Sequence, residues 1–252
     1  KAKYPTAVHV AYDPISAYAV RKANAITLGS NIIPTYHFDK AKVIVGFNCD
    51  FLGTWLNPTE NAKKYASGRV PTKDNPTMSR HHQFQSHVTL TGMNADYKYP
   101  IRPSEEKATL VALYNAVSGG SLSGGKTSVA KDVNKVAKEL LAAKGASLVV
   151  SGTNDVDIQL LANAINATLG NYGAVIDTSI TQNIKTGDDE SLAALAQDIK
   201  ANQVKAILLV DANPVYDSPF GEIFKKGISS AQLSVSLNDR ADESSSEAQY
   251  IC

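Results

Sequence analysis

Several features that assign a chain to a class are scarce in this sequence. It has two cysteines, Cys49 and Cys252, too few and too far apart for a disulfide framework or a thiolate metal cage within this chain. The 25 basic and 24 acidic residues nearly cancel, so no net field draws in nucleic acid or anionic lipid. The longest apolar runs, such as Ala206 to Val210, fall far short of the roughly 20 residues that a membrane helix needs. We therefore expect a soluble folded chain with no nucleic-acid partner and no membrane span.

The two ends of the sequence carry no processing signals. The first residue is a lysine and no signal peptide is visible, while Cys252 follows an apolar pair. These features predict a piece of a longer polypeptide, with targeting signals and cofactor ligands outside it.

Short apolar runs bounded by turn residues alternate with segments of helical period, which predicts the α/β class with mostly parallel sheets covered by helices. The expected strands are Ala7 to Tyr12, Val43 to Phe47, Ser147 to Val150, Ala174 to Ile176, Ala206 to Val210 and Leu233 to Leu237. The expected helices are Pro14 to Leu28, Ser104 to Val117, Val129 to Lys144, Val156 to Leu169 and Asp188 to Ala201. Asp13 and Pro14 mark the start of the first helix, and Gly29 marks its end.

Two stretches lack a sustained period. Asn57 to Tyr99 is rich in proline and polar residues and is interpreted as an elaborated connection. Ser118 to Thr127 is rich in glycine and serine, which is typical of a hinge or surface loop. The sequence therefore predicts an N-terminal α/β lobe at 1–117 and a C-terminal α/β lobe at 118–252, both part of a longer subunit.

The segment Gly120 to Thr127 reads Gly-Ser-Leu-Ser-Gly-Gly-Lys-Thr and matches the P-loop pattern, in which backbone amides and a lysine surround nucleotide phosphates. That mechanism needs a strand entering the loop, whereas Ala108 to Val117 has the pattern of a helix. A solvated loop is favoured, and a P-loop nucleotide-binding protein stays as an alternative function.

Three imidazoles lie between Arg80 and His87, and histidine is a common ligand of zinc and iron. His81 and His82 are neighbours and point apart on a helix or a strand, and no carboxylate or thiolate completes a ligand pattern nearby. Hydrogen bonding at the surface or between subunits is favoured over a metal site. His37 is expected to be a packed or capping residue.

No nucleophile elbow, C-x-x-C, H-E-x-x-H or strand-bound G-x-G-x-x-G occurs, which disfavours a hydrolase or a simple dehydrogenase. An apolar strand does run into Asn213-Pro214, and ligands of open α/β sheets bind at such carboxyl ends. Simple termination of the strand is equally compatible with this turn.

The strand followed by Asn-Pro resembles one in the molybdopterin oxidoreductase superfamily, as do Asn94 to Ser104 and the segments from Ala142 to Asn171. Within that superfamily the chain resembles the iron-sulfur B subunit of alternative complex III, the bacterial quinol:cytochrome c oxidoreductase, over nearly its whole length. The segments that carry this resemblance are Tyr12 to Ser16, Ile33 to Ala41, Asp50 to Trp55 and Met78 to His81.

The resemblance implies two Rossmann-like lobes that have lost their pterin cofactor. Asn48 and Asp50 stand where cofactor-binding relatives carry a glycine and Asn-Pro turn, and Asp211 replaces a glycine before Asn213. Carboxylates at these positions would repel a pyrophosphate. We expect Asn48, Asp50, Asp211 and Asn213 to mark vestigial pterin-side turns, with no catalytic, cofactor-binding or metal-ligating residue in this segment.

The resemblance also implies a place in respiratory electron transport. The segment is expected to be a non-catalytic part of a membrane complex on the periplasmic face of the bacterial inner membrane. Its expected partners are a multihaem cytochrome, polytopic quinol-binding membrane subunits and an iron-sulfur region of the same chain, which would carry the iron-sulfur clusters. A catalytic molybdopterin-binding oxidoreductase fragment is the alternative from the enzyme class.

Overall fold

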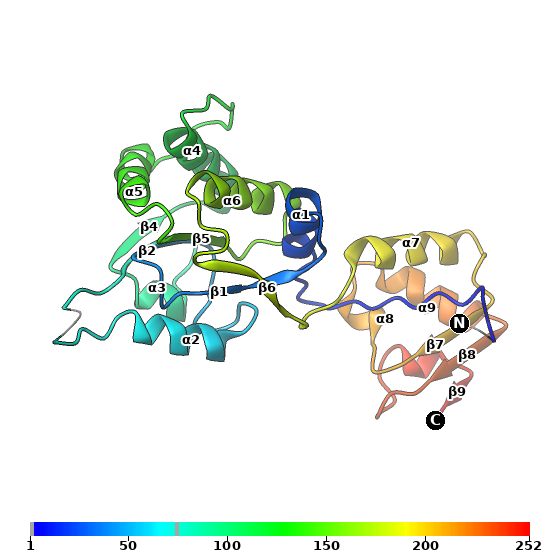
Figure 1. Ribbon diagram of the computed structural model, residues 1–252. Helices are drawn as coiled ribbons and strands as arrows, with labels where there is room; N and C mark the ends of the chain where they lie inside the picture. The colour runs from blue at the N-terminus through cyan, green and yellow to red at the C-terminus, as the bar shows by residue number, and fades with distance from the viewer. Residues whose placement is uncertain (1–2, 74–75) are drawn as a thin grey trace. The chain divides into compact units, whose positions relative to one another are not determined.

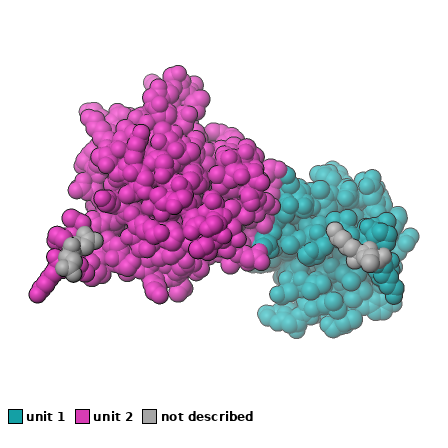
Figure 2. Space-filling view, in the orientation of Figure 1, with its two compact units in different colours: residues 1–16, 186–252 teal, residues 17–185 magenta. Residues whose placement is uncertain are grey.

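The computed structural model describes residues 3–73 and 76–252. The chain forms two compact units, coloured separately in Figure 2. Unit 2 is Ala17–Lys185, and unit 1 combines Lys1–Ser16 with Thr186–Cys252. Each unit has its own hydrophobic core and is described by itself.

Unit 2 is built on a four-stranded parallel sheet with the order β4-β3-β2-β5. Its strands are β2 (Val43–Phe47), β3 (Arg80–Gln85), β4 (Tyr97–Pro100) and β5 (Ser147–Ser151). Figure 1 shows α4 (Glu106–Ser118), α5 (Ala130–Ala142) and α6 (Val156–Thr168) on one side of this sheet, with α2 (Pro58–Ser67) and α3 (Leu90–Met93) on the other. The 3-10 turn η1 (Pro103–Glu105) leads into α4.

Strand β2 shows why the sheet is buried on both faces. Val43, Val45 and Phe47 belong to the core formed with α4, α5 and α6, whereas Ile44 belongs to a second core with Tyr65 of α2. Successive side chains of a strand point to opposite faces, so a strand that is apolar at every position must be covered twice. The second core also contains residues of β1 (Ile33–Tyr36) and β6 (Ile176–Gln182), which pair antiparallel.

Capping residues fix several helix boundaries. The side chains of Asn57 and Asp155 accept hydrogen bonds from the first turns of α2 and α6, as N-caps do. Helix α1 (Tyr18–Leu28) ends at Gly29, whose φ of 70° is left-handed, the conformation that favours glycine at a helix end. The predicted end of this helix is confirmed, and its start lies four residues later than the proline suggested.

Unit 1 contains a parallel sheet of β7 (Ala206–Leu209), β8 (Leu233–Ser236) and β9 (Tyr250–Ile251). Its remaining elements are α7 (Asp189–Lys200), α8 (Pro214–Asp217), α9 (Gly221–Ser230) and the 3-10 turn η2 (Ser245–Glu247). Val10 and Tyr12 pack against the core of this unit, and Ala11 accepts a hydrogen bond from the backbone of Asp188. The segment from Val10 to Tyr12 is therefore part of unit 1.

The predicted α/β class with mostly parallel sheets covered by helices is confirmed. The strand predicted at Ala7 to Tyr12 is wrong, because this segment packs without joining a sheet. The stretch Asn57 to Tyr99 is more than a connection, since it contains α2, β3, α3 and the start of β4.

The structure divides the chain differently from the predicted lobes 1–117 and 118–252. Helices α4 and α5 flank the expected boundary, yet both contribute to one core together with α6. The reason is that the chain returns to pair β5 with β2, which keeps the glycine-rich segment inside unit 2 as a surface loop.

Candidate functional site

The candidate site lies at the carboxyl end of the unit 2 sheet, between β2 and β5. From β2 the chain proceeds outward to β3 and β4, and then returns to β5 on the opposite side of β2. Ligands of open α/β sheets bind in the crevice at such a reversal of strand order. Phe47 and Ser151 are paired at the ends of the two strands, so the next residues of each strand face this switch point.

The buried carboxylate of Glu106, in the first turn of α4, lies at this switch point. It accepts hydrogen bonds from Asn48 Nδ2 at 2.7 Å, Thr153 Oγ1 at 2.7 Å and Ser151 Oγ at 3.3 Å. A buried carboxylate that is this well paired joins the two strand ends to the helix. The structure thus brings Asn48, predicted from the sequence, together with Glu106, which sequence reasoning missed.

The backbone after β5 is closely packed, and the amides of Gly152 and Thr153 donate hydrogen bonds within the chain. A Cβ atom added to Gly152 would lie 2.3 Å from the carbonyl oxygen of Asn48. The amide of Gly152 donates to Phe47 O at 3.0 Å, and that of Thr153 donates to Ser151 Oγ at 3.2 Å. Gln159 Nε2 donates to Ser151 O at 3.0 Å and to Thr153 O at 2.8 Å.

Asn48 has a φ of 43°, a left-handed conformation that asparagine tolerates better than most residues. Its amide donates to Phe84 O at 2.8 Å, and its Oδ1 accepts from Ser86 N at 2.8 Å. The turn after β2 is therefore held by hydrogen bonds within the chain on both sides of the asparagine.

Asp50 organises the same turn. Its Oδ1 accepts from Thr91 N at 3.0 Å, and its backbone carbonyl accepts from Gly53, Thr54 and Trp55. Burial raises the pKa of the neighbouring Cys49 thiol well above its usual range, and Asp50 and Glu106 add to the effect. The thiol therefore stays protonated, which makes Cys49 a packed residue and a poor nucleophile or metal ligand.

The second predicted pair, Asp211 and Asn213, follows β7 in unit 1. Asp211 is exposed with a φ of 49°. Asn213 Oδ1 accepts from the Oγ of Ser244 at 2.7 Å and its Nδ2 donates to Glu243 Oε2 at 2.7 Å. Asn213 therefore holds the loop that precedes η2. The two predicted pairs lie at strand ends of different units.

The histidine-rich segment forms β3, where His81 and His82 are fully buried on opposite faces of the sheet. His81 Nδ1 lies 3.1 Å from the Tyr65 hydroxyl, and His82 Nε2 lies 2.9 Å from Glu139 Oε2. The expected role in surface or inter-subunit contacts is wrong for these two residues, because the fold pairs both internally. His87 is exposed, and residues 3–73 and 76–252 contain no group of three or more histidine, cysteine or acidic side chains that could hold a metal ion.

The glycine-rich segment Gly120 to Thr127 follows α4 and has no strand before it. Asn115 of α4 accepts a hydrogen bond from the amide of Leu122 at 2.9 Å and donates one to its carbonyl at 2.8 Å. Lys126 is exposed. The segment therefore lacks the strand, loop and helix order on which phosphate binding by a P-loop depends.

Comparisons with known proteins assign no family to this chain. No protein-family model matches it, and no curated protein matches it. In the described part of the chain, no helix has both the length and the apolar character needed to cross a membrane.

Proposed function

We propose that this chain is a cofactor-free, structural portion of a molybdopterin-oxidoreductase-like subunit in a membrane-bound quinol:cytochrome c oxidoreductase complex. The observation that carries the proposal is the Glu106 carboxylate at the switch point, which the chain's own donors surround. In a cofactor-binding relative this place would receive an anionic pyrophosphate.

Electrostatics argue against a pyrophosphate here. Two like charges about 4 Å apart repel each other by about 4 kcal/mol at an effective dielectric constant of about 20. Glu106 and Asp50 both present carboxylates near the end of β2. A pyrophosphate placed at this strand end would be repelled by these carboxylates.

Hydrogen bonding leads to the same conclusion. A phosphate at a strand end is held by free backbone amides, but the amides of Asn48, Gly152 and Thr153 donate within the chain, as does that of Ser86. Binding a phosphate would break several of these bonds. The residues at the switch point therefore do not fit a pterin dinucleotide.

In the proposed complex this chain is a scaffold. The two cysteines are fewer than the four thiolates that an iron-sulfur cluster commonly takes, so we place the clusters in another region of the full subunit. The partners would be that region, a multihaem cytochrome and polytopic quinol-binding membrane subunits. The proposed location is the periplasmic face of the bacterial inner membrane.

The test is the metal and pterin content of the intact subunit, purified with its complex. Elemental analysis for iron, molybdenum and tungsten is combined with fluorescence of oxidised pterin after acid release. We expect iron without molybdenum, tungsten or pterin. Stoichiometric pterin would overturn the proposal in favour of a catalytic oxidoreductase fragment.

The structural role is tested separately by chemical cross-linking of the intact complex followed by mass spectrometry. We expect cross-links from lysines of this chain to a haem-carrying subunit. Purification of the chain with no haem-containing or membrane-embedded partner would contradict its placement in such a complex.

A further inference from the structure

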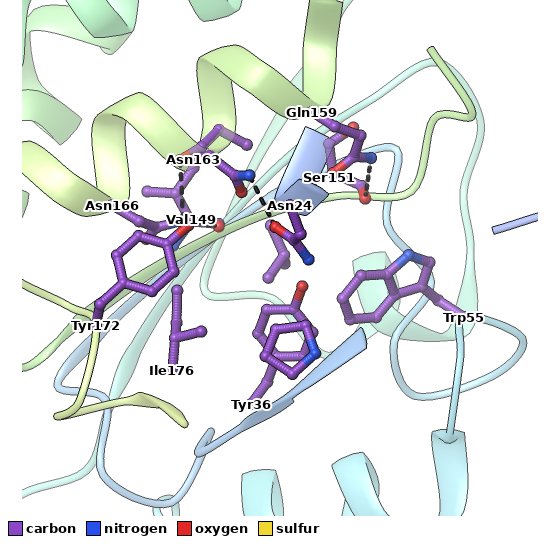
Figure 3. Close-up of a pocket in the computed structure, with 13 residues that line it drawn as sticks. Asn24, Tyr36, Trp55, Val149, Ser151, Gln159, Asn163, Asn166, Tyr172 and Ile176 are labelled. Atoms are coloured by element: carbon purple, nitrogen blue, oxygen red, sulfur yellow. Dashed lines mark hydrogen bonds between the residues drawn. The ribbon is translucent and has the colours of Figure 1, made fainter. Parts of the chain in front are cut away.

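The parallel sheet of unit 2 is closely covered on both faces. Strand β2 contributes to a separate core on each side. The cavity drawn in Figure 3, which Tyr36, Trp55 and Asn163 help to line, measures about 10 Å³, on the order of one water molecule. This cavity is therefore too small for an organic ligand.

The parallel sheet of unit 1 is covered by helices on one face. Ile207 and Leu209 of β7 belong to the core that this unit forms with α7 and α9. Successive side chains of a strand point to opposite faces, so Leu208 points away from these helices. The register of the three strands places Leu208 beside Val235, and Val235 beside Tyr250.

The opposite face of this sheet is apolar and exposed. We call it the open face, and its side chains are Leu208, Leu233, Val235, Leu237 and Tyr250. Leu208 is 62% exposed and Tyr250 is 59% exposed. Leu237 extends β8, since its amide donates to Leu209 O at 2.9 Å. Purely parallel sheets are almost always covered by helices on both faces, and an exposed apolar patch marks an interaction surface.

Charges of opposite sign lie at the two ends of the same sheet. The loops after β7 and β8 carry one basic and four acidic side chains, a net charge of −3, from Asp211, Asp239, Arg240, Asp242 and Glu243. Lys205 is exposed at the amino end of β7. An α-helix is positive at its N-terminus and negative at its C-terminus. A helix that lies across the open face antiparallel to the strands is therefore attracted at both of its ends.

We propose that the open face is the docking surface for an amphipathic α-helix from outside this chain, with its N-terminus at the acidic carboxyl ends of the strands. The apolar side of that helix covers the leucines and Tyr250, and its polar side faces solvent. The inference rests on the proposed function only because it needs a partner polypeptide. It does not depend on the pterin content, so the two proposals fail separately.

The first test is hydroxyl-radical footprinting of the native complex that contains the subunit and of the 252-residue chain alone. In the isolated chain Tyr250 should be oxidised about as readily as Tyr216, which is 76% exposed and lies in α8. In the complex the oxidation of Leu208 should fall about tenfold, to the level of Leu209, which is 6% exposed in the same strand. Equal oxidation of Leu208 and Tyr250 in both samples would overturn the proposal.

The second test identifies the occupant by photo-cross-linking in the complex, with p-benzoylphenylalanine in place of Leu233 or Leu237. Four residue steps of strand span roughly 13 Å, which corresponds to about nine residues along a helix. We expect the two cross-linked positions to lie about nine residues apart in one partner segment, with the Leu237 contact nearer its N-terminus. The same replacement at Tyr216, outside the open face, should not cross-link to that segment.

Three cross-linking results would overturn the proposal. Contacts about four residues apart would indicate a partner strand. A Leu233 contact nearer the N-terminus of the segment would contradict the orientation. Cross-links to the open face of a second copy of this chain would assign the surface to a dimer.

Discussion

Acidification should destabilise unit 2 through His81. This side chain lies beneath the sheet between Tyr65 and Gln83, and burial lowers its pKa from 6.5 to about 4. Gln83 donates through Nε2 to Cys49 O at 3.2 Å. Its Oε1 therefore accepts a hydrogen bond from the N–H group at His81 Nε2. The Nδ1 atom of the ring lies 3.1 Å from the Tyr65 hydroxyl, which donates to Asn94 O at 3.0 Å.

The sign and size of the effect follow from proton linkage. In the unfolded chain His81 is protonated below pH 6.5, whereas in the folded chain it is protonated only below about pH 4. The free energy of unfolding therefore falls as the pH falls between these two values. The contribution of neutral His81 to the free energy of unfolding is complete above pH 6.5 and is lost entirely below pH 4. At 1.36 kcal/mol per pH unit the contribution of His81 is about 3 kcal/mol.

The measurement is urea unfolding between pH 7 and pH 4. Trp55 is the only tryptophan of the sequence and belongs to unit 2, so its fluorescence reports on that unit. The comparison variant is His81→Gln, which keeps a buried amide at this position and does not titrate. Carboxylates and His82 titrate in both proteins, so their contributions cancel in the difference.

Between pH 7 and pH 4 we expect the free energy of unfolding to fall by about 3 kcal/mol more in the unmodified chain than in His81→Gln. A lower stability of the variant at pH 7 does not affect this test, because only the pH dependence is compared. Identical pH profiles for the two proteins would refute the claim that His81 is buried and neutral.

Three further predictions concern the switch point and unit 1. Glu106→Ala leaves Asn48 Nδ2 without its buried acceptor, and we expect the free energy of unfolding in urea to fall by about 3 kcal/mol. A decrease below about 1 kcal/mol would contradict the buried network. Gly152→Ala places a methyl group against the Asn48 carbonyl, and should cost about 1–3 kcal/mol in thermal unfolding; an unchanged Tm would disprove the close approach. Tyr12→Phe removes a 2.6 Å hydrogen bond to Asp217. Amide hydrogen exchange in unit 1 should therefore become faster, corresponding to a decrease of about 2 kcal/mol in the free energy of opening. An equal acceleration in unit 2 would contradict separate cores.

The sequence predicted those elements whose signals are local. Val43–Phe47 is apolar at every position and forms a strand covered on both faces. Gly29 marks the end of α1, and Asp188 caps the start of α7. Hydrophobic periodicity and capping depend on residues within a few positions of each other, so both can be recognised in the sequence without knowledge of the fold.

Strand β3 shows where prediction from the local sequence pattern fails. Its sequence, Arg-His-His-Gln-Phe-Gln, resembles an exposed loop, yet the strand lies inside the sheet between β2 and β4. Its polar side chains are buried because other elements supply hydrogen-bond partners, such as Tyr65 of α2 for His81 and Glu139 of α5 for His82. Burial of this kind depends on partners that are distant in sequence, which propensity does not encode.

The sequence by itself determined the α/β class, most strands and helices, and the strand-end positions of Asn48, Asp50, Asp211 and Asn213. Only the tertiary structure decided that Glu106, 58 positions after Asn48, reaches the same switch point, and that Val10 and Tyr12 pack against the core of unit 1. The physical reason is that hydrogen bonds and packing act over a few ångströms in space, whatever the distance along the chain.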